Sequence, residues 1–144
     1  MIKTRTIDVS FWNDEFVTNL SPLEKYFYNY LITNPRVSKC GIYKLDITSA
    51  SKELAVDEEL VVKMLGFFQN CGKLIYVGET DEIFLVNGYK YNMSQLDSKE
   101  CNIVNMELKA IRSSMLKRLF YGICKDKCSM GQGVLQCIFN GIEL

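Results

Sequence analysis

Carboxylates are the side chains of this 144-residue chain that come closest to a catalytic grouping. They cluster at residues 57–59, Asp-Glu-Glu, and again at Glu79, Asp81 and Glu82. Two carboxylates can act as general acid and general base when their surroundings separate their pKa values. Both clusters, however, fall at the ends of expected secondary-structure elements, where acidic residues are ordinary because they complement helix dipoles and face solvent. We therefore assign neither cluster to an active site.

Histidine, the commonest general base, is absent from the sequence. Its absence also removes the Ser-His and Cys-His nucleophile pairs and the imidazole ligands of most zinc sites. The glycines of residues 131–133 lack the lysine and the preceding strand that a phosphate-binding loop needs. We therefore expect a protein that binds another molecule, carries no cofactor and has no enzymatic activity.

Four of the six cysteines could be arranged around a metal ion. Cys124 and Cys128 have the spacing of a zinc-binding pair, Cys137 follows, and Cys101 would have to supply the fourth ligand. Thiols buried as small apolar side chains are more common, so we expect no metal site. Residues 1–5 lead into polar sequence rather than the apolar stretch of a secretory signal, which favours reduced thiols in a cytosol. Apolar runs of four or five residues are also too short to span a membrane.

The charges of the chain balance overall but are unevenly distributed. Lys plus Arg and Asp plus Glu each number 17, so the net charge exerts no general attraction toward nucleic acid. Residues 109–127, in contrast, carry six basic side chains and one acidic one, a sum of plus five. Within them we define the basic patch as Lys109, Arg112, Lys117 and Arg118. It would bind phosphates or an acidic partner, or it is the solvated face around a docking helix.

Capping signals and apolar periodicity indicate the elements that position these residues. Ser10 is expected to cap a short helix in which Trp12 and Phe16 share a buried face. Residues 21–24, Ser-Pro-Leu-Glu, combine a capping box with proline at the first helical position. The amphipathic helix that follows should end at residues 34–35, Asn-Pro, because the residue before proline is disfavoured in helical conformation.

Further elements are expected after residue 40. In order, they are a strand at 41–45, a short helix from Thr48 or Ser49 to Leu54, a helix at 57–71 capped by Asp57, strands at 74–77 and 83–86, and a long helix at 98–123. In the long helix, Ile111, Met115, Leu119 and Phe120 would pack on the domain or on a second subunit. A homodimer through this helix is therefore among our expectations.

The expected order of elements is that of a winged helix-turn-helix. Residues 55–56 would form the turn, residues 57–71 the recognition helix and residues 78–82 the wing. We predict an α+β, mostly helical fold, in which a winged helix with its N-terminal helix spans residues 1–93. A C-terminal helical extension would occupy residues 94–144.

Several short stretches carry a resemblance to a known family. They are Phe11-Trp12-Asn13-Asp14, Leu20-Ser21-Pro22-Leu23-Glu24-Lys25, Tyr30-Leu31-Ile32-Thr33-Asn34-Pro35, Gly41-Ile42-Tyr43, and Lys63-Met64-Leu65 through Gly72-Lys73-Leu74. With them, residues 8–90 resemble the N-terminal domains of phage replisome organisers, which are related to DnaD-type replication initiation proteins. The resemblance implies a winged helix that binds origin DNA and helps to recruit a helicase in the cytosol of a bacterial host.

Seven residues of the expected helix-turn-helix could contact DNA. They are Ser49, Ser51, Lys52, Lys63, Gln69, Asn70 and Lys73. However, residues 57–71 and residues 73–86 each contain three acids and one base, a balance of minus two. Cations supply most of the affinity for DNA, so these carboxylates would repel phosphates.

These observations support two functions from different classes. The leading hypothesis is a winged-helix DNA-binding module of a phage-type replication initiation protein, with double-stranded DNA, a replication protein or a host protein as partner. The alternative is a phage-encoded adaptor or inhibitor that uses acidic surfaces of the same scaffold to bind a host protein or nucleoprotein. A transcriptional regulator is a third option, and it would require dimeric half-site symmetry.

Overall fold

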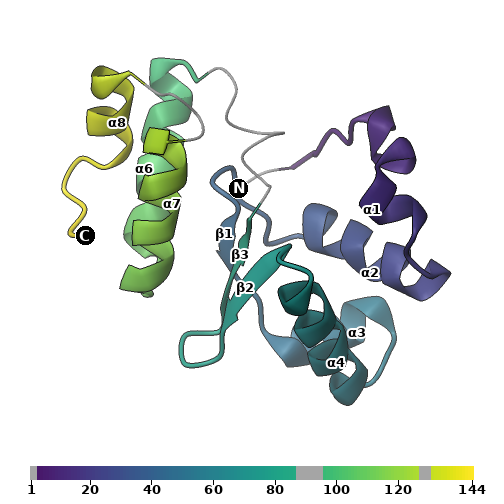
Figure 1. Cartoon of the computed structure of the whole chain (residues 1–144). Helices are drawn as coiled ribbons and strands as arrows, with labels where there is room; N and C mark the ends of the chain where they lie inside the picture. The colour runs from purple at the N-terminus through teal and green to yellow at the C-terminus, as the bar shows by residue number, and fades with distance from the viewer. Residues whose placement is uncertain (1–2, 87–95, 127–130) are drawn as a thin grey trace.

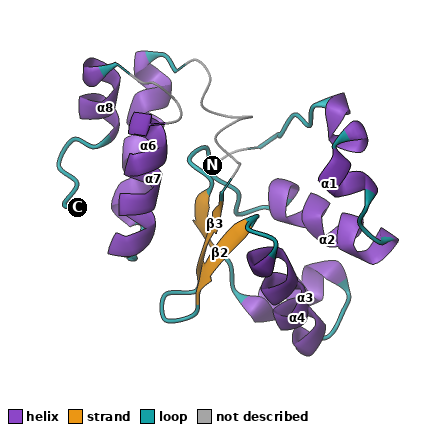
Figure 2. Cartoon of the chain, in the orientation of Figure 1, coloured by secondary structure: helices purple, strands orange, loops and turns teal. Residues whose placement is uncertain are grey.

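A computed structural model describes residues 3–86, 96–126 and 131–144 of the chain. It is an α+β fold, mostly helical, with a small antiparallel sheet, as expected at that level (Figures 1 and 2). The elements are η1 (Val9–Asn13), α1 (Glu15–Thr18), α2 (Pro22–Thr33), β1 (Ile42–Lys44), α3 (Ile47–Leu54), α4 (Glu58–Asn70), β2 (Leu74–Val77), β3 (Glu82–Leu85), α6 (Ser98–Ala110), α7 (Ser114–Asp126) and α8 (Gln132–Ile138). The expected boundary at residues 93–94 lies outside the described residues.

The three strands form a sheet in the order β1-β3-β2, with both pairs antiparallel. Tyr43 of β1 lies opposite Ile83 of β3, and Phe84 of β3 lies between Ile42 of β1 and Ile75 of β2. Side chains alternate between the two faces of a strand. Tyr43 and Ile83 therefore join one core, whereas Ile42 and Phe84 join another.

Helices cover both faces of this sheet. Figure 1 shows α1 to α4 on one side and α6 to α8 on the other. On the first side, Phe68 of α4 is fully buried and stacks on Phe27 and Tyr28 of α2, with ring centroids 5.8 and 5.2 Å apart. On the second side, Phe120 of α7 meets Phe84 edge to face, with centroids 6.3 Å apart. The sheet is thus the middle of three layers.

Local capping chemistry determines several helix ends, as the sequence predicts. Ser21 and Glu24 form the complete capping box: the Ser21 N–H donates to Glu24 Oε1 at 2.7 Å, and the Glu24 N–H donates to Ser21 Oγ at 3.2 Å. Helix α2, which this box starts, ends at Thr33, and Asn34 after it has an extended backbone conformation. Asp57 caps α4 by accepting the Leu60 N–H at 2.7 Å. These predictions are confirmed.

The first predicted helix is wrong in its start and in its buried face. Asp8, rather than Ser10, caps a 3-10 turn, and Asp14 then caps a separate helix, α1. Trp12 is consequently 58% exposed, and Phe11 is buried in its place. The two aspartates accept nearby backbone N–H groups, and such local bonds compete with a continuous helix. The start of α3 also differs slightly, because it is capped by Asp46.

The predicted long helix at 98–123 is also wrong, because the chain turns at residues 111–113 between α6 and α7. Ile111 is extended, with φ −75° and ψ 133°. The buried Glu82 carboxylate, on β3, accepts the N–H groups of Arg112 and Ser113 at 2.7 and 2.8 Å. In a continuous helix these N–H groups would donate to carbonyls four residues earlier. Here they connect the helical hairpin to the sheet.

A second glutamate, on α6, also connects the C-terminal helices to the sheet. Glu107 of α6 accepts the Lys39 N–H at 2.8 Å and the Cys40 N–H at 3.0 Å, just before β1. Asn105 of α6 donates through Nδ2 to the carbonyls of Ile138 and Asn140, which holds α8. Polar bonds in the interior therefore fix the C-terminal helices against the sheet. None of the described helices has the length and apolar character needed to cross a membrane.

Candidate functional site

Three of the seven predicted DNA-contacting residues already bond within the fold. The Ser49 hydroxyl donates to Asp46, the cap of α3, at 2.8 Å, and the Ser51 hydroxyl donates to the Val56 carbonyl. Gln69 accepts the Tyr76 backbone N–H through Oε1 at 2.9 Å. These polar groups hold the start of α3, the turn between α3 and α4, and the outer edge of β2. Their presence therefore has a structural explanation.

The remaining four predicted residues do not form one cationic surface. Lys73 Nζ lies 4.4 Å from the centroid of the Phe16 ring, so this half-buried lysine is engaged in a cation–π contact. Lys52 on α3 and both Lys63 and Asn70 on α4 are exposed. Helices α3 and α4 thus offer two exposed lysines and one exposed amide from the predicted set.

Acidic side chains dominate the start of α4. Asp57, Glu58 and Glu59 are all exposed there. Asp81, in the turn between β2 and β3, accepts the Tyr76 hydroxyl at 3.0 Å. Glu82, which the sequence predicts in the wing, is instead 3% exposed and accepts N–H groups from the turn between α6 and α7. The connection between β2 and β3 is therefore less acidic than predicted, whereas all three acidic side chains at the start of α4 are exposed.

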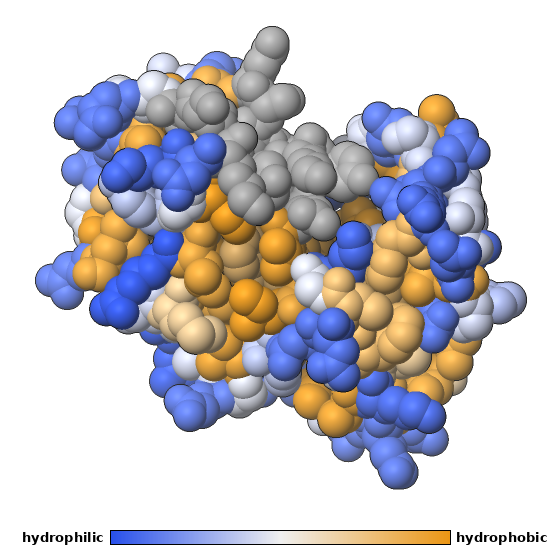
Figure 3. All heavy atoms as spheres, viewed as in Figure 1, coloured by the Kyte–Doolittle hydropathy of each residue, from blue (hydrophilic) through white to orange (hydrophobic). Residues whose placement is uncertain are grey.

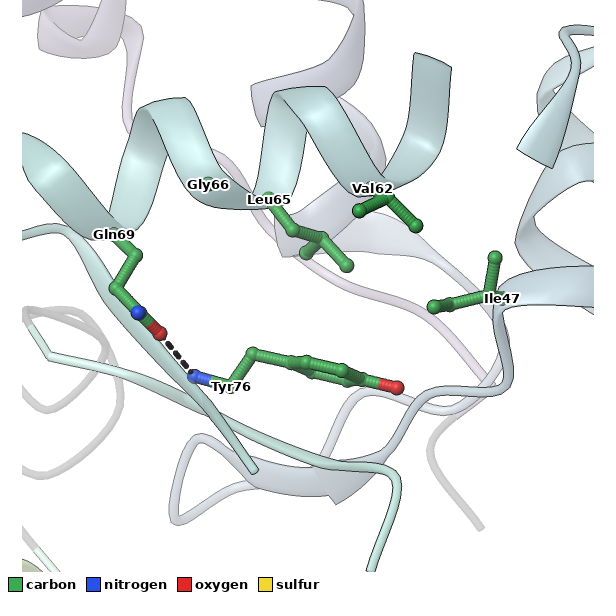
Figure 4. Close-up of a pocket in the computed structure, with 6 residues that line it drawn as sticks. All are labelled: Ile47, Val62, Leu65, Gly66, Gln69 and Tyr76. Carbon is green, nitrogen blue, oxygen red and sulfur yellow. Dashed lines mark hydrogen bonds between the residues drawn. The ribbon is translucent and has the colours of Figure 1, made fainter. Parts of the chain in front are cut away.

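A shallow groove lies beside these carboxylates. We define the α4 groove by its lining residues, which are Ile47, Val62, Leu65, Gly66, Gln69 and Tyr76, and its volume is about 200 Å³ (Figure 4). The side chains of Leu65 and Val62 extend from α4 on the side that faces Tyr76, and Ile47 lies at one end of the groove. The Tyr76 ring is held in place because its hydroxyl bonds Asp81 and the Leu45 carbonyl. Burial and the Asp81 bond raise the pKa of this hydroxyl to about 12, so it stays a neutral donor at physiological pH.

The basic patch surrounds the turn between α6 and α7. Lys109 lies in the last turn of α6, whereas Arg112 lies in the turn that follows, so the two cations do not lie on one helix. Lys109, Arg112 and Arg118 are exposed and Lys117 is half-buried. Ion pairs in the described part of the chain join Arg36 to Glu53 and Lys39 to Glu100, so none neutralises the patch.

Apolar side chains are exposed beside the basic patch. Met115 and Leu119 of α7 are 49% and 40% exposed, whereas Phe120 of the same predicted face is buried. Figure 3 shows an apolar band on this side of the molecule, between α7 and the β2–β3 hairpin. Ile75 and Val77 of β2 are only partly buried on the same face of the sheet. Packing of α7 on a second subunit stays a prediction.

The cysteines behave mainly as apolar side chains. Cys40, Cys101 and Cys124 are buried, Cys71 is exposed, and Cys128 lies outside the described residues. Burial raises the pKa of Cys40 to about 12, so its thiol is not a nucleophile near neutral pH. Among the described residues, no group of three or more potential metal-ligating side chains gathers in one place.

No protein-family model, curated protein or solved structure matches this chain.

Proposed function

We propose that this chain is a winged-helix module of the replication-initiation type, which binds duplex DNA and performs no catalysis. The element order α2, β1, α3, α4, β2, β3 and the sheet order β1-β3-β2 support this proposal. Between α3 and α4, a short link with Ala55 in left-handed conformation serves as the turn of the helix-turn-helix. The β2–β3 connection serves as the wing. The resemblance of residues 8–90 to phage replisome organisers points to replication.

The basic patch is the surface that suits DNA. Phosphate contacts by lysine and arginine supply most of the affinity of such proteins, and no such excess of exposed cations occurs on α4. The four cations of the basic patch would displace counterions from about four phosphates, which predicts a log–log slope of affinity against salt of about −3 to −4. DNA would thus lie along the helical hairpin α6–α7 more closely than along the N-terminus of α4.

A titration of labelled duplex DNA tests this function. We expect binding near 50 mM salt that weakens steeply by about 200 mM, and Arg112→Glu/Arg118→Glu should remove most of it. The charge-matched comparison is Arg112→Glu alone against Lys25→Glu on α2, which reverses one charge outside the basic patch and should change affinity little. Failure of the wild-type chain to bind duplex DNA at low salt would refute the proposal, as would equal losses in the two variants.

A second candidate function is a protein-binding adaptor or inhibitor that acts on a host protein or nucleoprotein. The exposed carboxylates at residues 57–59 favour it, because they complement a basic protein surface and repel phosphates. Affinity capture from a host lysate, with and without nuclease, separates the two functions. One protein recovered equally in both conditions supports the adaptor, whereas recovery that nuclease abolishes supports DNA binding.

A further inference from the structure

Gly66 occupies a position in α4 where the fold itself does not require glycine. A Cβ built at Gly66 would meet no heavy atom within 4 Å, and Gly66 is not among the glycines with positive φ. Glycine in a helix interior is nevertheless less favourable than alanine by about 1 kcal/mol. Because Gly66 has no side chain, the space beside it stays open, and this space is part of the α4 groove.

The size of the α4 groove suits one side chain of a partner. Its volume of about 200 Å³ is below the roughly 300–1,000 Å³ of pockets that hold small-molecule ligands. Val62, which is 53% exposed, and the partly buried Ile47 and Tyr76 make its walls apolar (Figure 4). An apolar side chain inserted here would remove these surfaces from water.

The charges around the α4 groove indicate what should flank that side chain. Glu58 and Glu59 precede Val62 by four and three residues, so they share its side of the helix. Asp46 directly precedes Ile47 and is exposed. Lys63 is the single cation of α4. The rim is therefore predominantly negative and complements lysine or arginine.

We propose that the α4 groove docks one large apolar side chain from a protein segment that carries lysine or arginine close to it on both sides. The inference rests on the protein-binding candidate function and identifies its site and the chemistry of its partner. Gly66 leaves room for the anchor, Val62 and Tyr76 contact it, and Glu58 and Glu59 pair with the flanking cations. DNA does not fit this description, since its phosphates would face the same carboxylates.

Selection from a random peptide library displayed against the full chain tests the proposal. Enriched peptides should share Leu, Met or Phe with Lys or Arg on both sides. A synthetic peptide of that consensus should bind the variant Gly66→Leu at least about tenfold more weakly than it binds the wild-type chain, because the leucine side chain fills the groove. Gly122→Leu is the matched control, because Gly122 also lies within a helix with no atom within 4 Å of a built Cβ. It should leave the affinity unchanged.

Two further variants test the groove independently, in case Gly66→Leu does not fold. Val62→Lys alters an exposed wall and should also abolish peptide binding, while Glu58→Gln/Glu59→Gln should weaken binding and reduce its salt dependence. If the peptides bind Gly66→Leu and the wild-type chain equally well, the α4 groove is not their binding site, although a protein-binding function would remain. Enrichment of acidic peptides, no enrichment at all, or self-association of the chain that Gly66→Leu abolishes would also overturn the proposal. Absence of any captured protein in the lysate experiment would instead contradict the broader adaptor function.

Discussion

Gly66 within α4 and Gly72 just after it illustrate different physical uses of one residue. Gly72 follows α4 with φ +75°, in the left-handed region that glycine adopts without steric cost, so it terminates the helix. Gly66 lies inside α4 with open space around it. The backbone requires Gly72, whereas Gly66 lines the α4 groove.

These roles predict opposite effects of alanine. Gly66→Ala should raise the free energy of unfolding by about 0.5–1 kcal/mol, because alanine is the better helix former and its methyl group meets no neighbour. Gly72→Ala should lower it by about 1–2 kcal/mol, because a Cβ is strained in left-handed backbone. Urea unfolding measures both. Destabilisation by Gly66→Ala would mean that the Cβ is in contact, which would remove the reason to regard the groove as open.

At the scale of elements, the sequence predicts structure well where the determining contacts are local. Ser21 with Glu24, and Asp57 with Leu60, lie within one helical turn of each other, and both caps form as predicted. The break between α6 and α7 depends instead on Glu82, which is about thirty residues away in the chain. Helical periodicity alone therefore predicts one continuous helix where the structure has two.

The Glu82 contact predicts a strong effect on stability. Glu82→Ala should lower the free energy of unfolding by about 2–3 kcal/mol, because it leaves the N–H groups of Arg112 and Ser113 without their charged acceptor. Glu79→Ala, an exposed change between β2 and β3, should change the free energy of unfolding by no more than about 0.5 kcal/mol. Equal urea midpoints for the two variants would contradict the assigned role of Glu82.

The candidate surfaces were predicted less completely than the fold. Ser49, Ser51 and Gln69 have side chains that serve either DNA or the fold, and sequence alone does not distinguish these uses. Charge alone predicts the basic patch, since clustered cations need no tertiary information, and its role stays a prediction. The α4 groove was missed, although a glycine between Val62 and Gln69 in a predicted helix was its available signal.

At the scale of the whole molecule, buried ionisable groups predict alkaline instability. Burial raises the pKa of Cys40 from 9.0 to about 12 and also raises the pKa of Tyr43. Above pH 9 the folded chain thus keeps protons that the unfolded chain releases. The stabilisation that these buried groups give the folded state is therefore complete below pH 9 and is lost as the pH rises toward 12. Urea unfolding between pH 8 and about 11 should show this fall, at up to about 1.4 kcal/mol per pH unit for each group.

A matched pair of thiol variants checks the cause of the alkaline instability. Cys40→Ala should make the pH dependence shallower, whereas Cys71→Ser, at an exposed position, should leave it unchanged. A free energy of unfolding that stays constant up to pH 11 would contradict the proposed contribution of the buried groups.

The charges of the molecule are separated between two regions that are far apart in the chain. Exposed carboxylates lie at the start of α4, and the basic patch surrounds the turn between α6 and α7. Our central claim is the proposal that this chain binds duplex DNA through the basic patch rather than through α4. Amide chemical-shift mapping of the full chain with a duplex at low salt tests it most directly. We predict that the largest changes fall at residues 109–118, and the largest changes on α4, or none anywhere, would contradict the claim.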